Sequence, residues 1–181
     1  NDVEKASDYI TKFSRLIREI LNNSSKLIVS LKEELEILNI CIKIEQLRVK
    51  GGFDFILNIS PEIDLAKINI PPLFLQPYIE NAIWHGLVKA DDEKQIILNI
   101  EKRDENIIIE IIDNGIGIEK SKELKRETLN RKKSFGTFAT RERIKLLFKG
   151  EDIDVSITDL KIYGKRGTKV TMNIPVEFAV Y

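Results

Sequence analysis

The segment around Glu80 carries side chains that could hold a metal–nucleotide complex. Asn81 and His85 lie four residues apart, so on a helix they project from the same face, with Glu80 to one side. The carbonyl oxygen of an asparagine is a hard ligand that suits Mg²⁺, which keeps several waters and completes its coordination with phosphate oxygens. The alternative interpretation is a set of surface polar residues on an ordinary helix.

A second candidate is the run Asp113-Asn114-Gly115-Ile116-Gly117, which follows an isoleucine-rich stretch. An aspartate at the end of a buried strand can accept a hydrogen bond from an exocyclic amine such as that of adenine. Gly115 and Gly117 would let the backbone approach a ligand closely. Because Asn-Gly is also a strong turn dipeptide, a plain hairpin turn is the alternative, although the polar segment that follows offers no obvious second strand.

Two further segments are weaker candidates when each is taken alone. Gly136 and Thr137 end the run Ser134 to Thr137, which precedes a segment with helical periodicity. Backbone amides at the start of a helix favour phosphate groups, and the alternative is a loop before a solvated, charged helix. Thr168 ends the run Gly164 to Thr168, which is the fourth candidate segment. The alternative interpretation of this run is a plain hairpin loop. Together, the four segments occur in one order on a plausible alternation of helices and strands.

The hydrophobic periodicity predicts two helices in residues 1–51. Apolar residues at three- and four-residue spacing form a first helix that the polar run 22–25 interrupts. Ser30 and Glu33 have the spacing of a capping box at the head of a second helix, which Gly51-Gly52 ends. Two such helices cannot bury both faces alone. We therefore predict a helical hairpin that pairs with a second copy of the chain.

Beyond Gly52 the pattern changes to alternation and to isoleucine-rich runs. Strands are predicted over residues 53–59, 95–103, 106–113, 153–162 and 168–175, with the second and third joined as a hairpin. A helix is predicted from Pro71-Pro72 through Trp84, with a kink or a late start at Pro77, and another over 140–148. This order predicts an α+β fold over residues 52–181, a two-layer sandwich with helices on one face of a mixed sheet.

The composition excludes some classes of function. Lys plus Arg and Asp plus Glu both number 29, and a zero net charge argues against binding nucleic acid mainly through its phosphates. No apolar run approaches the roughly 20 residues that a membrane helix needs. Cys41 lies in a helical apolar pattern, which predicts a buried thiol in the core. The chain opens in mid-pattern without Met, so we expect it to be part of a longer protein.

In their order, the four segments resemble the nucleotide-binding motifs of the GHKL superfamily (gyrase, Hsp90, histidine kinase, MutL). Residues 80–86 are similar to its N box, residues 113–117 and 134–137 to its two glycine boxes, and residues 167–168 to its last motif. The resemblance is closest to the LytS-like sensor histidine kinases. Their hallmark Pro-x-x-x-Leu-Gln-Pro-x-x-Glu-Asn-Ala is matched by residues 71–82, and helical segments within residues 9–48 also resemble that family.

This resemblance implies the Bergerat (GHKL) ATP-binding fold, with ATP and Mg²⁺ as ligands. It implies that Asp113 binds the adenine amino group, that Asn81 coordinates Mg²⁺ between the phosphates, and that Glu80 polarises the nucleophile. The other residues implied to contact the nucleotide are His85, Gly115, Gly117, Gly136, Thr137 and Thr168. Phosphoryl transfer needs mainly positioning and charge neutralisation, which such a set can supply.

The resemblance also implies partners. The sequence has one histidine, His85 of the N box, whereas the family's phosphoacceptor histidine is expected upstream, before a Phe-x-x-Asn segment. We therefore expect residues 1–51 to be a partial dimerisation hairpin and residues 52–181 a catalytic domain that does not autophosphorylate by itself. The implied partners are a second copy, as a homodimer, and the receiver domain of a response regulator. Such a fragment would be cytoplasmic and reach a bacterial inner membrane only through the upstream part.

Two departures from the family pattern keep alternatives open. Trp84 stands where such families often have Lys, and residues 134–139 differ from the usual Gly-x-Gly-Leu-x-Asn. A non-catalytic dimerisation or scaffold domain with a degenerate nucleotide site is therefore the first alternative. The second is an ATPase or chaperone module, but relatives of that kind place a general-base Glu one helical turn before the metal-binding Asn, where this chain has Pro77.

Overall fold

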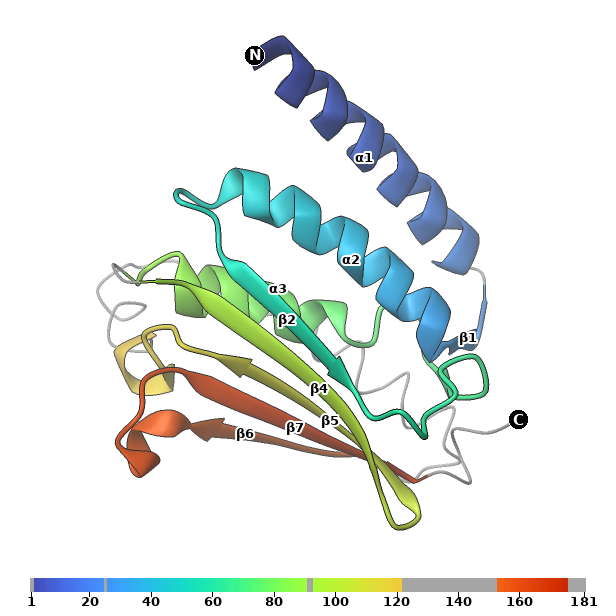
Figure 1. The fold of residues 1–181 in the computed structure, drawn as a ribbon, viewed down its shortest axis with the longest axis vertical. Coiled ribbons are helices and arrows are strands. Elements are labelled where there is room, and N and C mark those ends of the chain that lie inside the picture. Colours follow the sequence, from blue (N-terminus) through green and yellow to red (C-terminus); the bar gives the residue numbers. More distant parts are fainter. Residues whose placement is uncertain (1, 25, 91–92, 122–152, 176–181) are drawn as a thin grey trace.

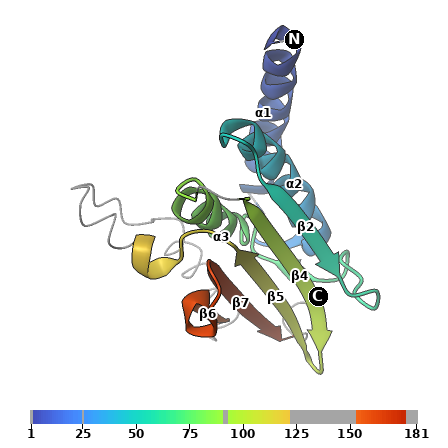
Figure 2. The same ribbon diagram turned by 60° about the vertical axis from the view of Figure 1, so that its left-hand side comes forward.

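One mixed sheet forms the base of the fold in the computed structural model, which describes residues 2–24, 26–90, 93–121 and 153–175. Its five strands stand in the order β2-β4-β5-β7-β6. They are β2 (Asp54–Ile59), β4 (Gln95–Arg103), β5 (Asn106–Asp113), β6 (Asp154–Asp159) and β7 (Thr168–Pro175). β2 runs parallel to β4, and the other neighbouring pairs are antiparallel. α2 and α3 lie on one face of this sheet (Figures 1 and 2).

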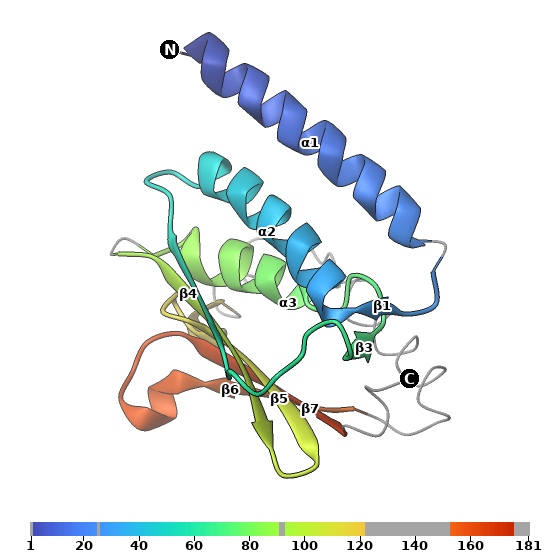
Figure 3. The same ribbon diagram turned by 45° about the vertical axis from the view of Figure 1, so that its right-hand side comes forward.

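Three α-helices precede the long hairpin. They are α1 (Asp2–Ser24), α2 (Leu31–Arg48) and α3 (Gln76–Asn81), which continues as the π-helical segment η1 (Ala82–Leu87). α2 lies beside α3, and α1 lies outermost, against α2 (Figures 1 and 3). A two-stranded ribbon of β1 (Val29–Ser30) and β3 (Asn69–Ile70) ties the start of α2 to the segment before α3. The predicted α+β two-layer arrangement, with two helices in front of it, is confirmed.

The sheet buries one face under the helices and leaves the other face half-exposed. In β4, the inward residues Ile96, Leu98 and Ile100 are buried, and the residues between them are only partly buried. On the open face, Lys169 donates to Glu110 across neighbouring strands at 2.5 Å. The predicted hairpin is confirmed, since Arg103 pairs with Asn106 across a two-residue turn. Buried and partly buried residues alternate in this way when one face of a largely antiparallel sheet packs on the core and the other faces solvent.

α2 packs into the same core as the sheet, whereas α1 does not. Leu31, Leu38 and Ile42 of α2 belong to the main cluster, which also holds the buried residues of the strands. The buried apolar residue of α1, Leu16, joins a smaller cluster on the outer side of α2. Cys41 lies in that smaller cluster, and burial raises the pKa of its thiol to about 12. The prediction of a buried core thiol is confirmed.

A capping box starts α2 where the sequence predicts it. The Ser30 hydroxyl oxygen accepts from the Glu33 amide at 3.2 Å, and the Ser30 amide donates to the Glu33 carboxylate at 2.9 Å. Lys26 and the Ser30 amide together lower the pKa of Glu33 to about 2. Two amides at the helix start, which have no partner within the helix, are thereby satisfied.

Replacing Ser30 with Ala should lower the free energy of unfolding by about 1 kcal/mol, because the amide of Glu33 loses its acceptor. Chemical denaturation followed by circular dichroism measures this loss. The matched variant Glu33→Gln keeps a side-chain acceptor for the Ser30 amide and should cost less. Equal losses in the two variants would contradict this assignment of the cap.

Two predicted boundaries are wrong. The helix does not begin at Pro71-Pro72 but at Gln76, because Leu73 adopts a left-handed backbone with φ of 59° that no helix tolerates. The expected late start at Pro77 is thus correct, and Pro77 sits in the first turn, where no amide is needed. The strand predicted over 153–162 ends at Asp159, and residues Leu160–Tyr163 form the 3-10 helix η2.

Several predictions fall outside the described residues. They are the helix over 140–148 and the second glycine box with Gly136 and Thr137. Among the residues that the structure describes, no helix has the length and apolar character needed to cross a membrane.

Candidate functional site

A cavity of about 510 Å³ lies between the α3–η1 helix and the sheet. The helix contributes Asn81 and His85 to its lining, β5 contributes Asp113, and β7 contributes Thr168. Further lining residues are Tyr78, Ala82, Gly86, Ile111, Gly117, Ile118, Ser121, Ile157 and Val170. The side chains that the sequence placed on one helical face, Asn81 and His85, therefore do face the same cavity.

Asp113 is the buried carboxylate of this cavity. It ends β5 and is 4% exposed. Burial raises the pKa of Asp113 to about 6, against hydrogen bonds from Gly115 and Thr168 that favour the ionised form. The Gly115 amide donates to its Oδ1 at 2.9 Å. An acceptor held in an apolar cavity by fixed donors can recognise an amino group by hydrogen bonding.

Gly86 and Gly115 bring the helix and the loop after β5 into direct contact. A Cβ on Gly115 would lie 2.4 Å from the backbone carbon of Gly86, and a Cβ on Gly86 would lie 2.8 Å from Oδ1 of Asp113. The Ile116 amide donates to the Gly86 carbonyl at 3.3 Å. The first glycine box therefore needs glycine at 115 for close packing against the N-box helix. Gly115 shapes this wall without itself lining the cavity.

Asn114 has a structural role in the same loop. Its Oδ1 accepts from the Gln95 amide at 2.8 Å, and its Nδ2 donates to the Glu93 carbonyl at 2.9 Å. Both bonds attach the loop after β5 to the start of β4. Asn114 therefore anchors the loop to the start of β4, whereas its neighbours Asp113 and Gly117 line the cavity.

Asp159 fixes the other end of the glycine box, and nothing in the sequence singled it out. Its Oδ2 accepts from the amides of Ile118 and Glu119, at 2.8 and 3.1 Å, where a short helix begins. A hydrogen bond from the Lys161 amide, together with these two, lowers the pKa of Asp159. The Asp159-Leu160-Lys161 run is enough to predict a local turn. The contact between Asp159 and Ile118 could not be predicted, because the two residues are 41 positions apart in the sequence.

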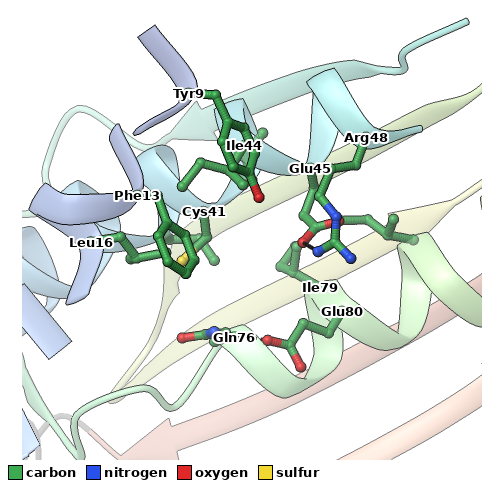
Figure 4. Close-up of a pocket in the computed structure, with 13 residues that line it drawn as sticks. Tyr9, Phe13, Leu16, Cys41, Ile44, Glu45, Arg48, Gln76, Ile79 and Glu80 are labelled. Atoms are coloured by element: carbon green, nitrogen blue, oxygen red, sulfur yellow. Dashed lines mark hydrogen bonds and ion pairs between the residues drawn. The ribbon is translucent and has the colours of Figure 1, made fainter. Parts of the chain in front are cut away.

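Glu80 lies on a different side of α3 from the cavity. It lines a smaller hollow of about 90 Å³ between α1, α2 and α3. Figure 4 shows Glu80 and Gln76 together on α3, facing Tyr9 and Phe13 of α1 and Arg48 of α2. Gln76 donates to Glu80 at 2.8 Å. The structure thus brings Asn81, His85, Asp113, Gly117 and Thr168 together, and it places Glu80 apart from them.

Trp84 also points away from the cavity. The guanidinium of Arg48, at the end of α2, lies over its ring at 4.9 Å from the centroid. Arg48 also donates to Glu45 at 2.7 Å. The residue that replaces the lysine frequent in the family therefore contacts α2, and it does not line the nucleotide-sized cavity.

Comparison with known proteins finds sensor histidine kinases as relatives. The family described as "Histidine kinase" matches residues 1–53. The sensor protein LytS of Oceanobacillus iheyensis is 36% identical over 118 residues, which is 65% of this chain and 20% of that protein. LytS of Bacillus subtilis is 29% identical over 180 residues, which is 97% of this chain and 29% of that protein. The expected resemblance to the LytS-like sensor histidine kinases is confirmed.

Solved structures agree in fold with this LytS-like chain. The histidine kinase domain of the blue-light activated histidine kinase of Erythrobacter litoralis matches 96% of this chain and 82% of its own, with a TM-score of 0.57 and 14% identity. The histidine kinase ThkA, solved in complex with the response regulator protein TrrA, matches 93% of this chain and 48% of its own, with a TM-score of 0.52 and 14% identity. The expected histidine kinase catalytic fold is confirmed. The chain spans less than a third of the length of the two LytS proteins.

Proposed function

We propose that this LytS-like chain is the ATP-binding catalytic region of a two-component sensor histidine kinase. It would transfer the γ-phosphate of ATP to a histidine outside these 181 residues, for relay to a response regulator. The observation that carries the proposal is the convergence of Asn81, His85, Asp113 and Thr168 on one cavity of about 510 Å³. A cavity of this size, with a few polar groups on an apolar wall, suits a nucleotide.

Each side of the cavity would hold a different part of ATP. Asp113, at the buried sheet end, would accept the adenine amino group, with Thr168 beside it and Gly117 in the wall. Asn81 and His85, on the helix, would face the phosphates. Gly136 and Thr137, which lie outside the described residues, would cover the phosphates from the second glycine box.

Mg²⁺ fits this arrangement as part of a nucleotide complex. The described residues contain no group of three or more His, Cys, Asp or Glu side chains that could hold a metal ion by themselves. Mg²⁺ commonly uses one or two protein oxygens and completes its shell with waters and substrate phosphates. Asn81 would supply such an oxygen, and the ion would supply neutralisation of phosphate charge. Mg²⁺ is then expected to bind only together with ATP.

Glu80 remains our proposed residue for polarising the nucleophile. From its place in the hollow between the helices, it could meet an acceptor that approaches from the side of α1 and α2. His85 lines the nucleotide cavity and is the one histidine of the sequence. The acceptor would therefore come from elsewhere, and the 181-residue chain is not expected to autophosphorylate.

The helical part supports a homodimer as partner. Ile10, Phe13 and Ile17 of α1 are 63%, 44% and 43% exposed, and they form one apolar stripe together with Leu21. An amphipathic helix with an exposed apolar stripe is stabilised when a second copy covers it. A response regulator receiver domain is the second proposed partner, by likeness to ThkA, which was solved with TrrA.

A dimerisation scaffold with a degenerate nucleotide site and no transferase activity is the second candidate function. The observation that favours it is Trp84, which stacks under Arg48 and adds no cation to the phosphate end of the cavity. A scaffold of this kind would bind nucleotide weakly or not at all.

Calorimetric titration with a non-hydrolysable ATP analogue and Mg²⁺ tests the proposal. The wild-type chain should bind, and Asp113→Ala should bind at least about tenfold more weakly, because a hydrogen bond to a buried charged group is lost. Asp154→Ala, at an exposed aspartate of β6, is the matched control and should bind like wild type. Absence of binding by the wild-type chain would favour the scaffold.

A further inference from the structure

Glu34 is a buried carboxylate that the nucleotide cavity does not explain. It lies on α2, is 2% exposed, and is with Asp113 one of two buried acidic residues among the described parts of the chain. Its Oε2 accepts from the Leu73 amide at 2.8 Å, and its Oε1 accepts from the Leu75 amide at 3.0 Å. The Phe74 amide between them also donates to this carboxylate. Three consecutive amides thus converge on one side chain.

These three amides belong to the segment that starts the N-box helix. Pro71-Pro72 before it and Pro77 after the first helical residue have no amide hydrogen, and the N-cap residue Leu75 has no side-chain cap. Leu73 holds a left-handed backbone with φ of 59°. Buried amides without a partner are costly, as is this backbone for a leucine. Glu34 therefore stabilises a helix start that the local sequence cannot stabilise.

The same helix is held at two further places along its length. Arg48, at the other end of α2, stacks on Trp84 at 4.9 Å. Gly86 packs on Gly115 and accepts from the Ile116 amide at 3.3 Å. Figures 1 and 3 show α2 beside this helix. Of these attachments, the one through Glu34 lies at the start of the helix, on the N-terminal side of Asn81.

We propose that Glu34 is a positioning residue, which holds the start of the α3–η1 helix so that Asn81 and His85 stand at a fixed distance from Asp113. The inference rests on the proposed function, in which the helix meets the phosphates and the sheet meets adenine. Asp113 is fixed through β5 and β7 without Glu34, since it pairs with Thr168 in the sheet. Releasing the helix start therefore displaces the phosphate side of the cavity and leaves the adenine side in place.

Glu34→Gln is the decisive variant. Glutamine keeps one acceptor oxygen but turns an NH₂ donor toward the amides, so the segment 73–75 loses part of its support. Affinity for Mg²⁺-ATP should fall about tenfold, while affinity for adenosine, which has no phosphates, should change less than about twofold. Calorimetry measures the first and ligand-observed NMR the second. Glu36→Gln, the same change on the exposed face of α2, should alter neither affinity.

Two further measurements separate positioning from loss of the fold. Trp84 is the single tryptophan, so its emission should shift in Glu34→Gln at an unchanged far-ultraviolet circular dichroism spectrum. Glu34→Asp keeps both acceptor oxygens on a shorter side chain and should recover part of the Mg²⁺-ATP affinity. It also serves as the test variant if Glu34→Gln does not fold, and it should then lose Mg²⁺-ATP affinity while keeping adenosine affinity.

Equal losses of Mg²⁺-ATP and adenosine affinity would overturn the inference, because Glu34 would then support only the stability of the whole domain. Unchanged affinities for both ligands would overturn it as well. If the wild-type chain binds adenosine and Mg²⁺-ATP equally, or binds neither, the proposed function fails, and the inference fails with it.

Discussion

Gly167→Ala should unfold the catalytic part of the chain or destabilise it by at least about 4 kcal/mol, an effect expected only of severe steric conflict. Gly167 has a φ of 104°, and a Cβ there would lie 1.8 Å from the Asp113 carbonyl oxygen. The neighbouring residue Thr168 pairs with Asp113 in the sheet. The methyl group can therefore be accommodated only if β7 separates from the end of β5, where Asp113 and Thr168 line the cavity.

Gly164→Ala is the matched control for this effect. Gly164 lies in the same connection between β6 and β7 and also has a positive φ, of 68°, but a Cβ there would meet nothing within 4 Å. The control should cost only about 1 kcal/mol, from the left-handed backbone alone. Urea denaturation of the three proteins measures both values. Similar losses in Gly164→Ala and Gly167→Ala would show that backbone strain, and not the contact with Asp113, decides the cost.

Nucleotide affinity and apo stability should change in opposite directions as pH rises through 6. Burial raises the pKa of Asp113 from its ordinary 3.8 to about 6 in the folded protein. Its contribution to stability is therefore complete below pH 3.8 and is lost as pH rises through 6, where the buried carboxylate ionises. The loss is about 3 kcal/mol at most, from a shift of about two pKa units. In the proposed function, however, the ionised form is the one that would accept the adenine amino group.

Adenosine affinity should accordingly increase about tenfold per pH unit below pH 6 and level off above pH 7, because only the ionised form of Asp113 binds. Adenosine is the ligand to use, since it has no phosphate that titrates in this range. In Asp113→Asn the pH dependence of adenosine affinity should disappear and that of stability should become smaller, and the variant should be more stable than wild type at pH 8. The pKa of Glu34 is also raised, to about 7, so the contribution of Asp113 is the difference between wild type and this variant. A wild-type affinity that is constant between pH 5 and 7 would contradict the assignment.

The sequence alone determined the elements whose causes are local. The Ser30–Glu33 capping box, the break near residue 24 and the 95–113 hairpin are all present, because a cap, a turn and an apolar period act within a few residues. The shared face of Asn81 and His85 follows from helical spacing in the same way. The motifs at 80–86 and 113–117 sufficed to indicate the family for the same reason, since each is a continuous run of residues.

Only the tertiary structure decided how these runs are held and which way their side chains face. The Glu34 carboxylate reaches the Leu75 amide, and the Asp159 carboxylate reaches the Ile118 amide, each across 41 residues. Glu80 lies next to Asn81 in sequence, yet it faces α1 and α2 and not the cavity. A motif specifies which residues are neighbours along the chain. Burial and backbone hydrogen bonding between distant segments determine which of those neighbours meet at the site.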